Sequence, residues 1–239
     1  MLEELCTGLG AVILYFIVFA GIAIILRRFV RIPNEVFRKL LHCIMLGAFF
    51  VWTVKFETWW LAVLAALGFA GAIYPVLKLL EFIPGFSEFV TERRRGELKN
   101  SLLIVFAMYA VVASVCWGWH GERVLSLCCI YAWGFGDAAA ALIGKRFGRH
   151  KLSGRHIEGV KSMEGTLAMF LSSFLSVFLI LMYRGGITWH LCFIAAMLTA
   201  AVSAAVEVYS LRGMDTITCP LAAMVVLVPT LEVFGGGAL

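Results

Sequence analysis

The chain has 239 residues, of which 62% are hydrophobic and only 15% are charged. A soluble core of this size cannot hold so much apolar surface, so the composition excludes a soluble globular protein and indicates an integral membrane protein. Because lipid offers no partner to backbone N–H and C=O groups, we expect an all-α polytopic fold.

The predicted elements are eight apolar runs near twenty residues long, the length that crosses ~30 Å of hydrocarbon. Pro220 and Pro229 should kink or interrupt the last run, and Pro75 should do so less severely in the third. No polar stretch is long enough for a soluble domain, so residues 1–239 are expected to form a single transmembrane domain. The runs are 8–26, 36–54, 58–80, 100–119, 123–143, 165–183, 189–209 and 216–234.

The positions of the basic residues indicate the topology. All but three of the 20 lysines and arginines lie in the odd-numbered connections, the exceptions being Lys55, Arg123 and Arg184. The positive-inside rule therefore places these connections in the cytoplasm and both termini on the opposite face. A seven-span alternative would move only the C-terminus. The net charge of +5 is explained in this way, without a nucleic acid partner.

The connection between the third and fourth runs has an amphipathic pattern. Apolar residues recur at three- and four-residue spacing over 82–90, beside the charged run 91–95. This pattern predicts an interfacial helix on the cytoplasmic surface, within residues 81–100.

Four acidic residues stand at the predicted cytoplasmic ends of the apolar runs, where membrane insertion disfavours them. They are Asp137, Glu164, Glu207 and Asp215. Carboxylates gathered at one surface beside lysines and arginines suit Mg²⁺ and phosphate, because Mg²⁺ takes one or two carboxylates together with phosphate oxygens and water. The alternative is that each carboxylate pairs with a nearby basic residue and stabilises the fold.

The densest polar stretch follows the fifth run. Glycines there would let the backbone approach a bulky ligand, and the lysines would bond phosphate oxygens. Asp137 could hold the metal that bridges those oxygens. The spacing of Gly144 and Gly148 is equally typical of helix packing in membranes. The stretch comprises Gly136, Asp137, Gly144, Lys145, Gly148 and Lys151, followed by Lys161, Ser162 and Glu164.

Four blocks in this order resemble the polyprenol kinase family, which includes dolichol kinase, phytol kinase and the CTP-dependent diacylglycerol kinase of fungi. The first two are Arg38-Lys39-Leu-Leu-His42, similar to R-K-x-x-H, and Arg95-Gly96-Glu97-Leu98, similar to G-E-L. The third is Gly136-Asp137 with Lys161-Ser162-Met163-Glu164-Gly165, similar to K-S-x-E-G. The fourth is Glu207 with Asp215-Thr216-Ile217-Thr218-Cys219-Pro220, similar to D-N-x-T-x-P, with Thr216 where the family usually has asparagine.

The resemblance implies a kinase that transfers the γ-phosphoryl group of CTP to a membrane lipid alcohol, with Mg²⁺, at the cytoplasmic surface. Asp137 is the expected metal ligand, with Glu164 and Asp215 as further ligands or orienting groups. Either His42 or Glu207 would be the base on the lipid hydroxyl. Phosphate and nucleotide contacts are expected from the remaining residues of the blocks: Arg38, Lys39, Arg95, Gly136, Gly144, Lys145, Gly148, Lys151, Lys161, Ser162 and Thr218.

Two other functions are compatible with parts of this pattern. The third block also resembles phosphatidate cytidylyltransferases, in which phosphatidate would attack the α-phosphate of CTP and pyrophosphate would leave. A small transporter would instead have inverted repeats and broken helices at the midplane, whereas the acidic residues here lie at one surface. The identity of the lipid (polyprenol or dolichol, phytol, or diacylglycerol) and the formation of a homodimer are left open.

Overall fold

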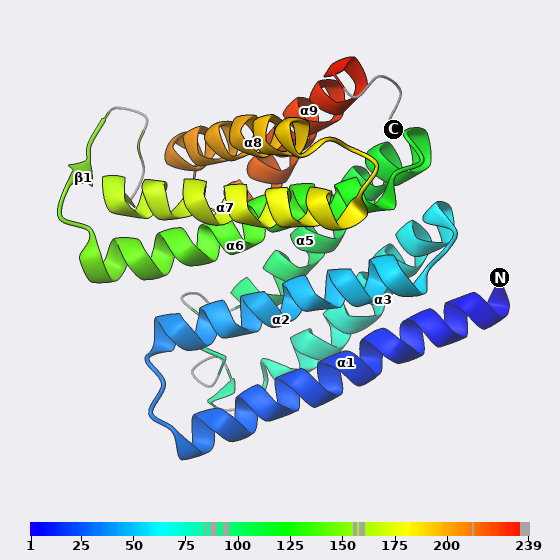
Figure 1. Ribbon diagram of the computed structural model, residues 1–239. Helices are drawn as coiled ribbons and strands as arrows, with labels where there is room; N and C mark the ends of the chain where they lie inside the picture. Colours follow the sequence, from blue (N-terminus) through cyan, green and yellow to red (C-terminus); the bar gives the residue numbers. More distant parts are fainter. Residues whose placement is uncertain are drawn as a thin grey trace. The chain divides into compact units, whose positions relative to one another are not determined.

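The computed structural model describes residues 1–83, 85–86, 90–92, 96–154, 157, 161–211 and 213–234. Within these residues, eight helices are long and apolar enough to cross a membrane (Figure 1). The predicted all-α fold with eight helices of membrane-spanning length is therefore confirmed. The predicted interfacial helix within 81–100 lies partly outside the described residues. Arg95 lies outside them as well.

The described residues group into two compact units, Met1–Val111 and Val112–Leu239. The prediction of a single domain over 1–239 stays a prediction, since this grouping does not say whether either unit folds alone. The first unit contains α1 (Leu2–Phe29), α2 (Asn34–Lys55), α3 (Trp59–Leu80) and most of α5 (Glu97–Ala113).

Aromatic side chains form the core of the first unit. Trp52 of α2 is fully buried and stacks on Phe56, and its indole N–H donates to the carbonyl of Ala62, at 3.0 Å. Phe69 of α3 and Phe106 of α5 pack edge-on against the same indole, and their own rings are tilted against each other. Since the indole N–H is satisfied, this large side chain can be buried without leaving a polar group unpaired.

Glu4 joins the start of α1 to the connection between α2 and α3. Its carboxylate accepts hydrogen bonds from the backbone N–H groups of Glu57 and Thr58, at 2.8 and 2.9 Å, and from the Thr58 hydroxyl at 3.1 Å. Thr58 directly precedes α3, so the negative charge lies where the first N–H groups of that helix are unpaired. The expected antiparallel order of the first spans places these two segments at the same end.

The second unit is a bundle of four helices in which α6 packs on α7, α7 on α8 and α8 on α9, while α9 returns to α6. A short antiparallel pair of strands connects α6 to α7, and α9 runs through Pro220 and Pro229, so the prolines do not interrupt it. The elements are η1 (Ser114–Trp119), α6 (Arg123–Phe147), β1 (Lys151–Leu152), β2 (Lys161–Ser162), α7 (Met163–Arg184), α8 (Trp189–Tyr209) and α9 (Asp215–Phe234).

Small residues bring α6 and α7 into close contact. A Cβ atom on Gly165 of α7 would lie 3.0 Å from the carbonyl oxygen of Ala140 and 3.3 Å from the Cα of Gly144. About two turns further along α7, the Ser173 hydroxyl donates to the carbonyl of Ala132 at 2.5 Å. Close backbone approach of this kind is how membrane helices gain packing energy without a hydrophobic driving force.

An arginine and a histidine, each in contact with a glutamate, join helix ends at the opposite end of this bundle from the strands. Arg184, at the end of α7, makes a two-pronged contact with Glu122, at 2.6 and 3.0 Å. His120 Nδ1 lies 2.8 Å from Glu232 of α9. The connection that precedes α6 is therefore attached to both α7 and α9.

We predict that Gly165→Ala lowers the thermal stability of the protein in detergent, because the added methyl group would press on the backbone of α6. Overpacking of this kind costs about 1–3 kcal/mol. The matched control is Gly71→Ala in α3, where a Cβ would meet nothing within 4 Å. This control should be neutral or stabilising, since alanine favours a helix over glycine by roughly 0.5–1 kcal/mol. Equal melting temperatures for the two variants would contradict the close α6–α7 contact.

Candidate active site

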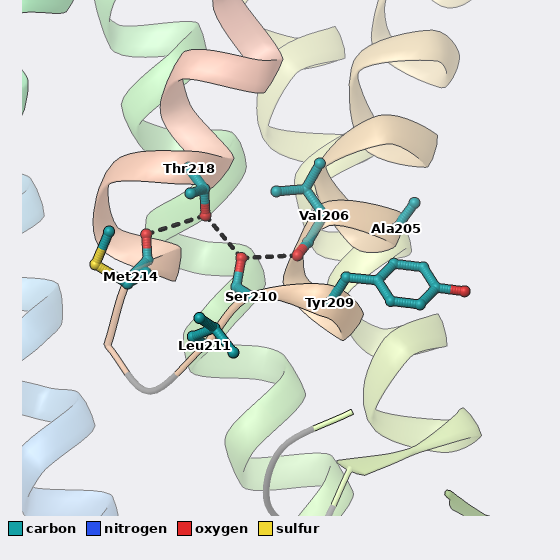
Figure 2. Close-up of a pocket in the computed structure, with 7 residues that line it drawn as sticks. All are labelled: Ala205, Val206, Tyr209, Ser210, Leu211, Met214 and Thr218. Carbon is teal, nitrogen blue, oxygen red and sulfur yellow. Dashed lines mark hydrogen bonds between the residues drawn. The ribbon is translucent and has the colours of Figure 1, made fainter. Parts of the chain in front are cut away.

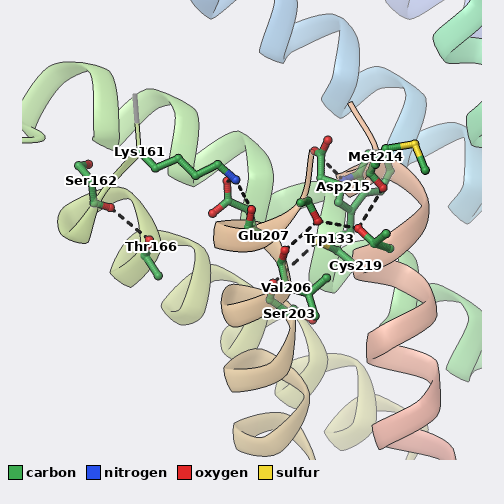
Figure 3. A network of polar contacts seen from close by, with 12 residues as sticks. Trp133, Lys161, Ser162, Thr166, Ser203, Val206, Glu207, Met214, Asp215 and Cys219 are labelled. Atoms are coloured by element: carbon green, nitrogen blue, oxygen red, sulfur yellow. Dashed lines mark hydrogen bonds and ion pairs between the residues drawn. The ribbon is translucent and has the colours of Figure 1, made fainter. Parts of the chain in front are cut away.

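A lysine and a carboxylate from distant parts of the chain form an ion pair at one end of the second bundle. Lys161 of β2 places its Nζ 3.0 Å from Oε1 of Glu207 in α8, and also donates to the backbone carbonyl of Glu207 (Figure 3). The two side chains are only 18% and 15% exposed. The pair is therefore shielded from most of the solvent, where charge–charge attraction is stronger than at an open surface.

The helix termini favour Lys161 and Asp215 where they lie. Glu207 lies two residues before the end of α8, where the helix carries a partial negative charge, and Lys161 donates to the Glu207 carbonyl, which also accepts from the Ser210 N–H. Asp215 is the first residue of α9, where the partial charge is positive. A cation and an anion thus each lie at the helix end that favours them.

Asp137 and Asp215 lie close enough to Glu207 to interact with it electrostatically. All three carboxylates also interact electrostatically with the Cys219 thiol. Trp133, one turn before Asp137 on α6, makes a long contact from its indole nitrogen to the Asp215 carboxylate, at 3.5 Å. Elements α6, α8 and α9 therefore bring three of the four predicted acidic residues to one place, together with Lys161. Carboxylates that lie this close disfavour one another's charged forms and favour a nearby cation.

The fourth predicted acidic residue, Glu164, has a local role. Its Oε1 lies 2.7 Å from Nδ1 of His150, and the carboxylate also accepts from the His150 backbone N–H. The neighbouring Ser162 is the N-cap of α7, since its hydroxyl accepts from the N–H of Gly165 at 3.1 Å. In the K-S-x-E-G element, Ser162, Glu164 and Gly165 therefore hold the start of α7 while Lys161 reaches Glu207.

The glycines predicted to approach a nucleotide lie against α7 and its N-cap. A Cβ on Gly136 would lie 2.6 Å from the Ser173 hydroxyl, and one on Gly148 would lie 2.6 Å from the Ser162 hydroxyl. Gly144 faces Gly165, as described above. Each glycine therefore allows close packing, which is the alternative that the glycine spacing also predicted. The contacts with a nucleotide stay a prediction.

The remaining predicted residues of the second unit lie around its strand-bearing end. Lys145, in the last turn of α6, and Lys151 of β1 have exposed side chains. The Thr218 hydroxyl is 3.0 Å from the carbonyl oxygen of Met214 and 2.7 Å from the Ser210 hydroxyl. Thr218 therefore belongs to a hydroxyl pair between α8 and α9.

In the first unit, the structure connects the first two sequence blocks. Arg38 lies 2.6 Å from Glu35 and 3.5 Å from Glu97, so the start of α2 is paired with the start of α5. Lys39 is buried, with 7% of its surface exposed, and His42 is half-buried one turn after Arg38. The proposed phosphate and base roles of these residues stay predictions.

The donor atoms of the second unit suit a hard cation. Among the described residues, no three His, Cys, Asp or Glu side chains are grouped closely enough to enclose a metal. Mg²⁺ needs only one or two carboxylates when phosphate oxygens and water supply its other ligands. Asp137 and Asp215 provide oxygen donors of this type, so the residues fit an ion that binds together with a nucleotide.

Sequence reasoning missed three residues that the structure brings into this region. Trp133 gave no functional signal in the sequence, because an indole in an apolar run is normally a packing residue. His150 stood beside the basic stretch without a pattern to connect it to Glu164, fourteen positions later. Ser210 carried no signal, since a single serine after a span is common, although Thr218 was part of a recognised block.

These helices and this cluster define an all-α integral membrane protein with a carboxylate- and lysine-bearing site where its spans end. Comparison with known proteins gives the family. No family model matches the chain, and no solved structure matches it. It is 32% identical over 229 residues to a protein named phytol kinase from Synechocystis sp., with 92% of this chain and 87% of that protein covered.

A second relative is the protein named probable phytol kinase, chloroplastic, from Triticum aestivum, with 28% identity over 231 residues, 89% of this chain and 72% of that protein. The chain therefore belongs to the polyprenol and phytol kinase family, whose members are lipid-alcohol kinases. The resemblance carried by the four sequence blocks is confirmed.

We predict that Lys161 and Glu207 are energetically coupled. In a double-mutant cycle of Lys161→Met and Glu207→Leu, either single change leaves a shielded charge unpaired, whereas the double change removes both. The expected coupling from thermal or denaturant unfolding is about 1–3 kcal/mol. The more exposed pair Glu35–Arg38, three residues apart on α2, is the control and should give less than about 1 kcal/mol. Additive single changes at Lys161 and Glu207 would contradict the coupling.

Proposed function

We propose that this protein transfers the γ-phosphoryl group of CTP to the hydroxyl group of a membrane lipid alcohol, with phytol as the first substrate to test. The observation that carries the proposal is the convergence of Asp137, Lys161, Glu207 and Asp215 at one end of the second bundle, in a member of this family. The two relatives bear phytol kinase names, which favours a kinase over the cytidylyltransferase alternative.

The reaction requires one bond to form and one to break. The hydroxyl oxygen of the lipid attacks the γ-phosphorus, and the bond from that phosphorus to the oxygen bridging the β- and γ-phosphates breaks, so that CDP leaves with the electron pair. The hydroxyl proton passes to Glu207 in our proposal and then to water. Lys161, already beside Glu207, is suited to bind a phosphate oxygen and to hold the carboxylate in position.

Catalysis of this kind depends mostly on positioning and on neutralising charge. Mg²⁺ bound with the nucleotide would neutralise charge on the β- and γ-phosphates, and Asp137 is our first choice for its protein ligand, with Asp215 second. The block that contains Arg38 and Lys39 is expected from the family resemblance to bind phosphate, with His42 as the alternative base.

We place the reaction on the cytoplasmic face of the membrane, with both termini on the other face. The support is the distribution of basic residues along the chain, since the connections on the side of Arg149 hold nearly all of them. Nucleotides are available on that face, and the tail of the lipid alcohol would remain in the bilayer while its hydroxyl group meets the phosphate.

The products test the proposal. Purified protein in lipid nanodiscs, given γ-labelled CTP, Mg²⁺ and phytol, should form labelled phytyl phosphate and CDP in equal amounts. ATP should support slower transfer. Equal or faster transfer with ATP would remove the CTP assignment and keep the kinase. Release of pyrophosphate when phosphatidate is supplied in place of phytol would replace the kinase by a cytidylyltransferase.

Asp137→Asn should abolish phosphoryl transfer without unfolding the protein. Asparagine keeps the shape of aspartate but loses the charge that a metal needs, so we expect turnover to fall by orders of magnitude at a normal melting temperature. Stabilisation of the wild type by CTP with Mg²⁺ should be lost as well. Glu232→Gln, at the opposite end of the bundle, is the control and should retain activity. A folded Asp137→Asn protein with more than about a tenth of wild-type turnover, a barrier change below ~1.4 kcal/mol, would refute the metal role.

A further inference from the structure

Three buried residues of the second bundle lie one helical turn deeper than the carboxylates of the candidate active site. Helices α6 and α8 run toward the end that holds the carboxylates, and α9 runs away from it. On each helix, the deeper residue stands four positions from a carboxylate, so the two are neighbours on the helix surface. The pairs are Trp133 with Asp137 on α6, Ser203 with Glu207 on α8, and Cys219 with Asp215 on α9.

These deeper residues hold the first turn of α9 between its two neighbours. Trp133 is 2% exposed, and its indole Nε1 lies 3.5 Å from Oδ2 of Asp215 (Figure 3). The thiol of Cys219 lies 3.8 Å from the carbonyl oxygen of Ser203, and both residues are fully buried. The start of α9 is also joined to the end of α8 by the hydroxyl pair drawn in Figure 2. The beginning of α9 is therefore in contact with α6 on one side and with α8 on the other.

The acidic residues themselves work against this arrangement. Asp137 and Asp215 both interact electrostatically with Glu207, and like charges repel one another. Asp215 is the first residue of α9, and helix ends fray. Its carboxylate can therefore turn away from the other two unless its side chain is held.

Trp133 can hold this carboxylate without cancelling its charge. An indole N–H is a neutral donor, and a carboxylate has about four lone-pair sites, so one such contact leaves it able to bind a metal. Glu207 differs, because the cationic Lys161 lies 3.0 Å from it and compensates its charge. Since Mg²⁺ binds charged carboxylates, a carboxylate held by an indole suits it better than one held by a lysine.

We propose that Trp133 is a positioning residue whose indole N–H holds the Asp215 carboxylate on the side of Asp137, so that both can bind the Mg²⁺ that accompanies the nucleotide. This inference rests on the proposed function and adds a residue outside the four sequence blocks. Trp133 acts through Asp215 and not on the reacting atoms.

A matched pair of variants separates this role from ordinary packing. Trp133→Phe keeps a buried aromatic ring and removes the N–H. Trp52→Phe removes the same donor from a fully buried indole of the first unit, where it bonds the neutral carbonyl of Ala62 at 3.0 Å. Both variants lose packing area and a hydrogen bond, so any effect of these losses alone appears in both. Only Trp133→Phe loses a contact with a carboxylate.

The first measurement needs no turnover. The full-length protein in nanodiscs, with saturating CTP and no lipid alcohol, is melted at increasing Mg²⁺ concentrations. Trp133→Phe should raise the Mg²⁺ concentration for half-maximal stabilisation by about fivefold or more, and Trp52→Phe by less than about twofold, whatever their melting temperatures without Mg²⁺. Ca²⁺ accepts irregular ligand geometry, so its midpoint should change by less than about twofold in Trp133→Phe.

A double-mutant comparison tests whether Trp133 acts through Asp215. In an Asp215→Asn background, Trp133→Phe should change the Mg²⁺ midpoint by less than about twofold, because the charge that the indole positions is already gone. An undiminished effect of Trp133→Phe in this background would overturn the inference.

The second measurement is spectroscopic and uses the wild type labelled with 5-fluorotryptophan. The ¹⁹F resonance of Trp133, identified by its absence from Trp133→Phe, should shift when Mg²⁺ and CTP are added together, and that of Trp52 should not. Should Trp133→Phe fail to fold, Asp215→Asn identifies the resonance, since it changes the charge beside that indole.

The outcomes separate this inference from the proposed function. A Trp133→Phe protein with the Mg²⁺ midpoint of the wild type, or a Trp133 resonance that does not shift, would overturn the positioning role and leave the kinase standing. If the wild type binds Mg²⁺ with CTP but phosphorylates no alcohol, the kinase fails, and the Mg²⁺ midpoints still decide the role of Trp133. A wild type that Mg²⁺ does not stabilise in the presence of CTP would overturn both.

Discussion

A charged side chain near the end of a membrane span is stabilised by a partner, because hydrocarbon solvates it poorly, at a cost that insertion scales put at roughly 2.5–3.5 kcal/mol at the centre of a span. The candidate active site depends on this constraint. Glu207 is kept inside the last turns of α8 by Lys161, which binds both its carboxylate and its backbone carbonyl. The same pairing that makes the carboxylate tolerable also fixes it in position next to the other acidic residues of the bundle.

The position of Lys161 depends in turn on the packing of α6 against α7. Gly165 lets the two backbones meet, and Ser162 caps α7 at the point where the chain arrives from the strand pair. Glu164 holds the other side of the connection through His150. We therefore expect a change at Gly165 to affect the position of Lys161 as well. Residues 161–165 therefore contribute both to the packing of α7 and to the candidate active site.

Much of the fold could be predicted from sequence, because hydropathy and chain length determine membrane spans strongly. The ends of the helices were predicted less accurately. For example, α1 begins at Leu2 and α5 at Glu97, because these helices extend beyond the apolar runs into polar residues. The sequence predicted which residues belong to the candidate site, but not the contacts that each of them makes. Sequence could not tell that Ser162 and Gly144 serve packing and capping, because glycine and serine suit both a phosphate and a helix contact. Nor could it find the Ser210–Thr218 pair, which depends on how two helix ends meet.

The ion pair between Lys161 and Glu207 also has a consequence for biosynthesis. The partners are 46 residues apart, and the lysine comes first. At roughly 5–20 residues per second, a ribosome needs a few seconds to travel from one codon to the other. The cation is thus already at the membrane surface, beside a completed α7, when the apolar part of α8 enters the bilayer and its carboxylate follows. The order of the chain therefore makes the cationic partner available before the carboxylate that it binds is synthesised.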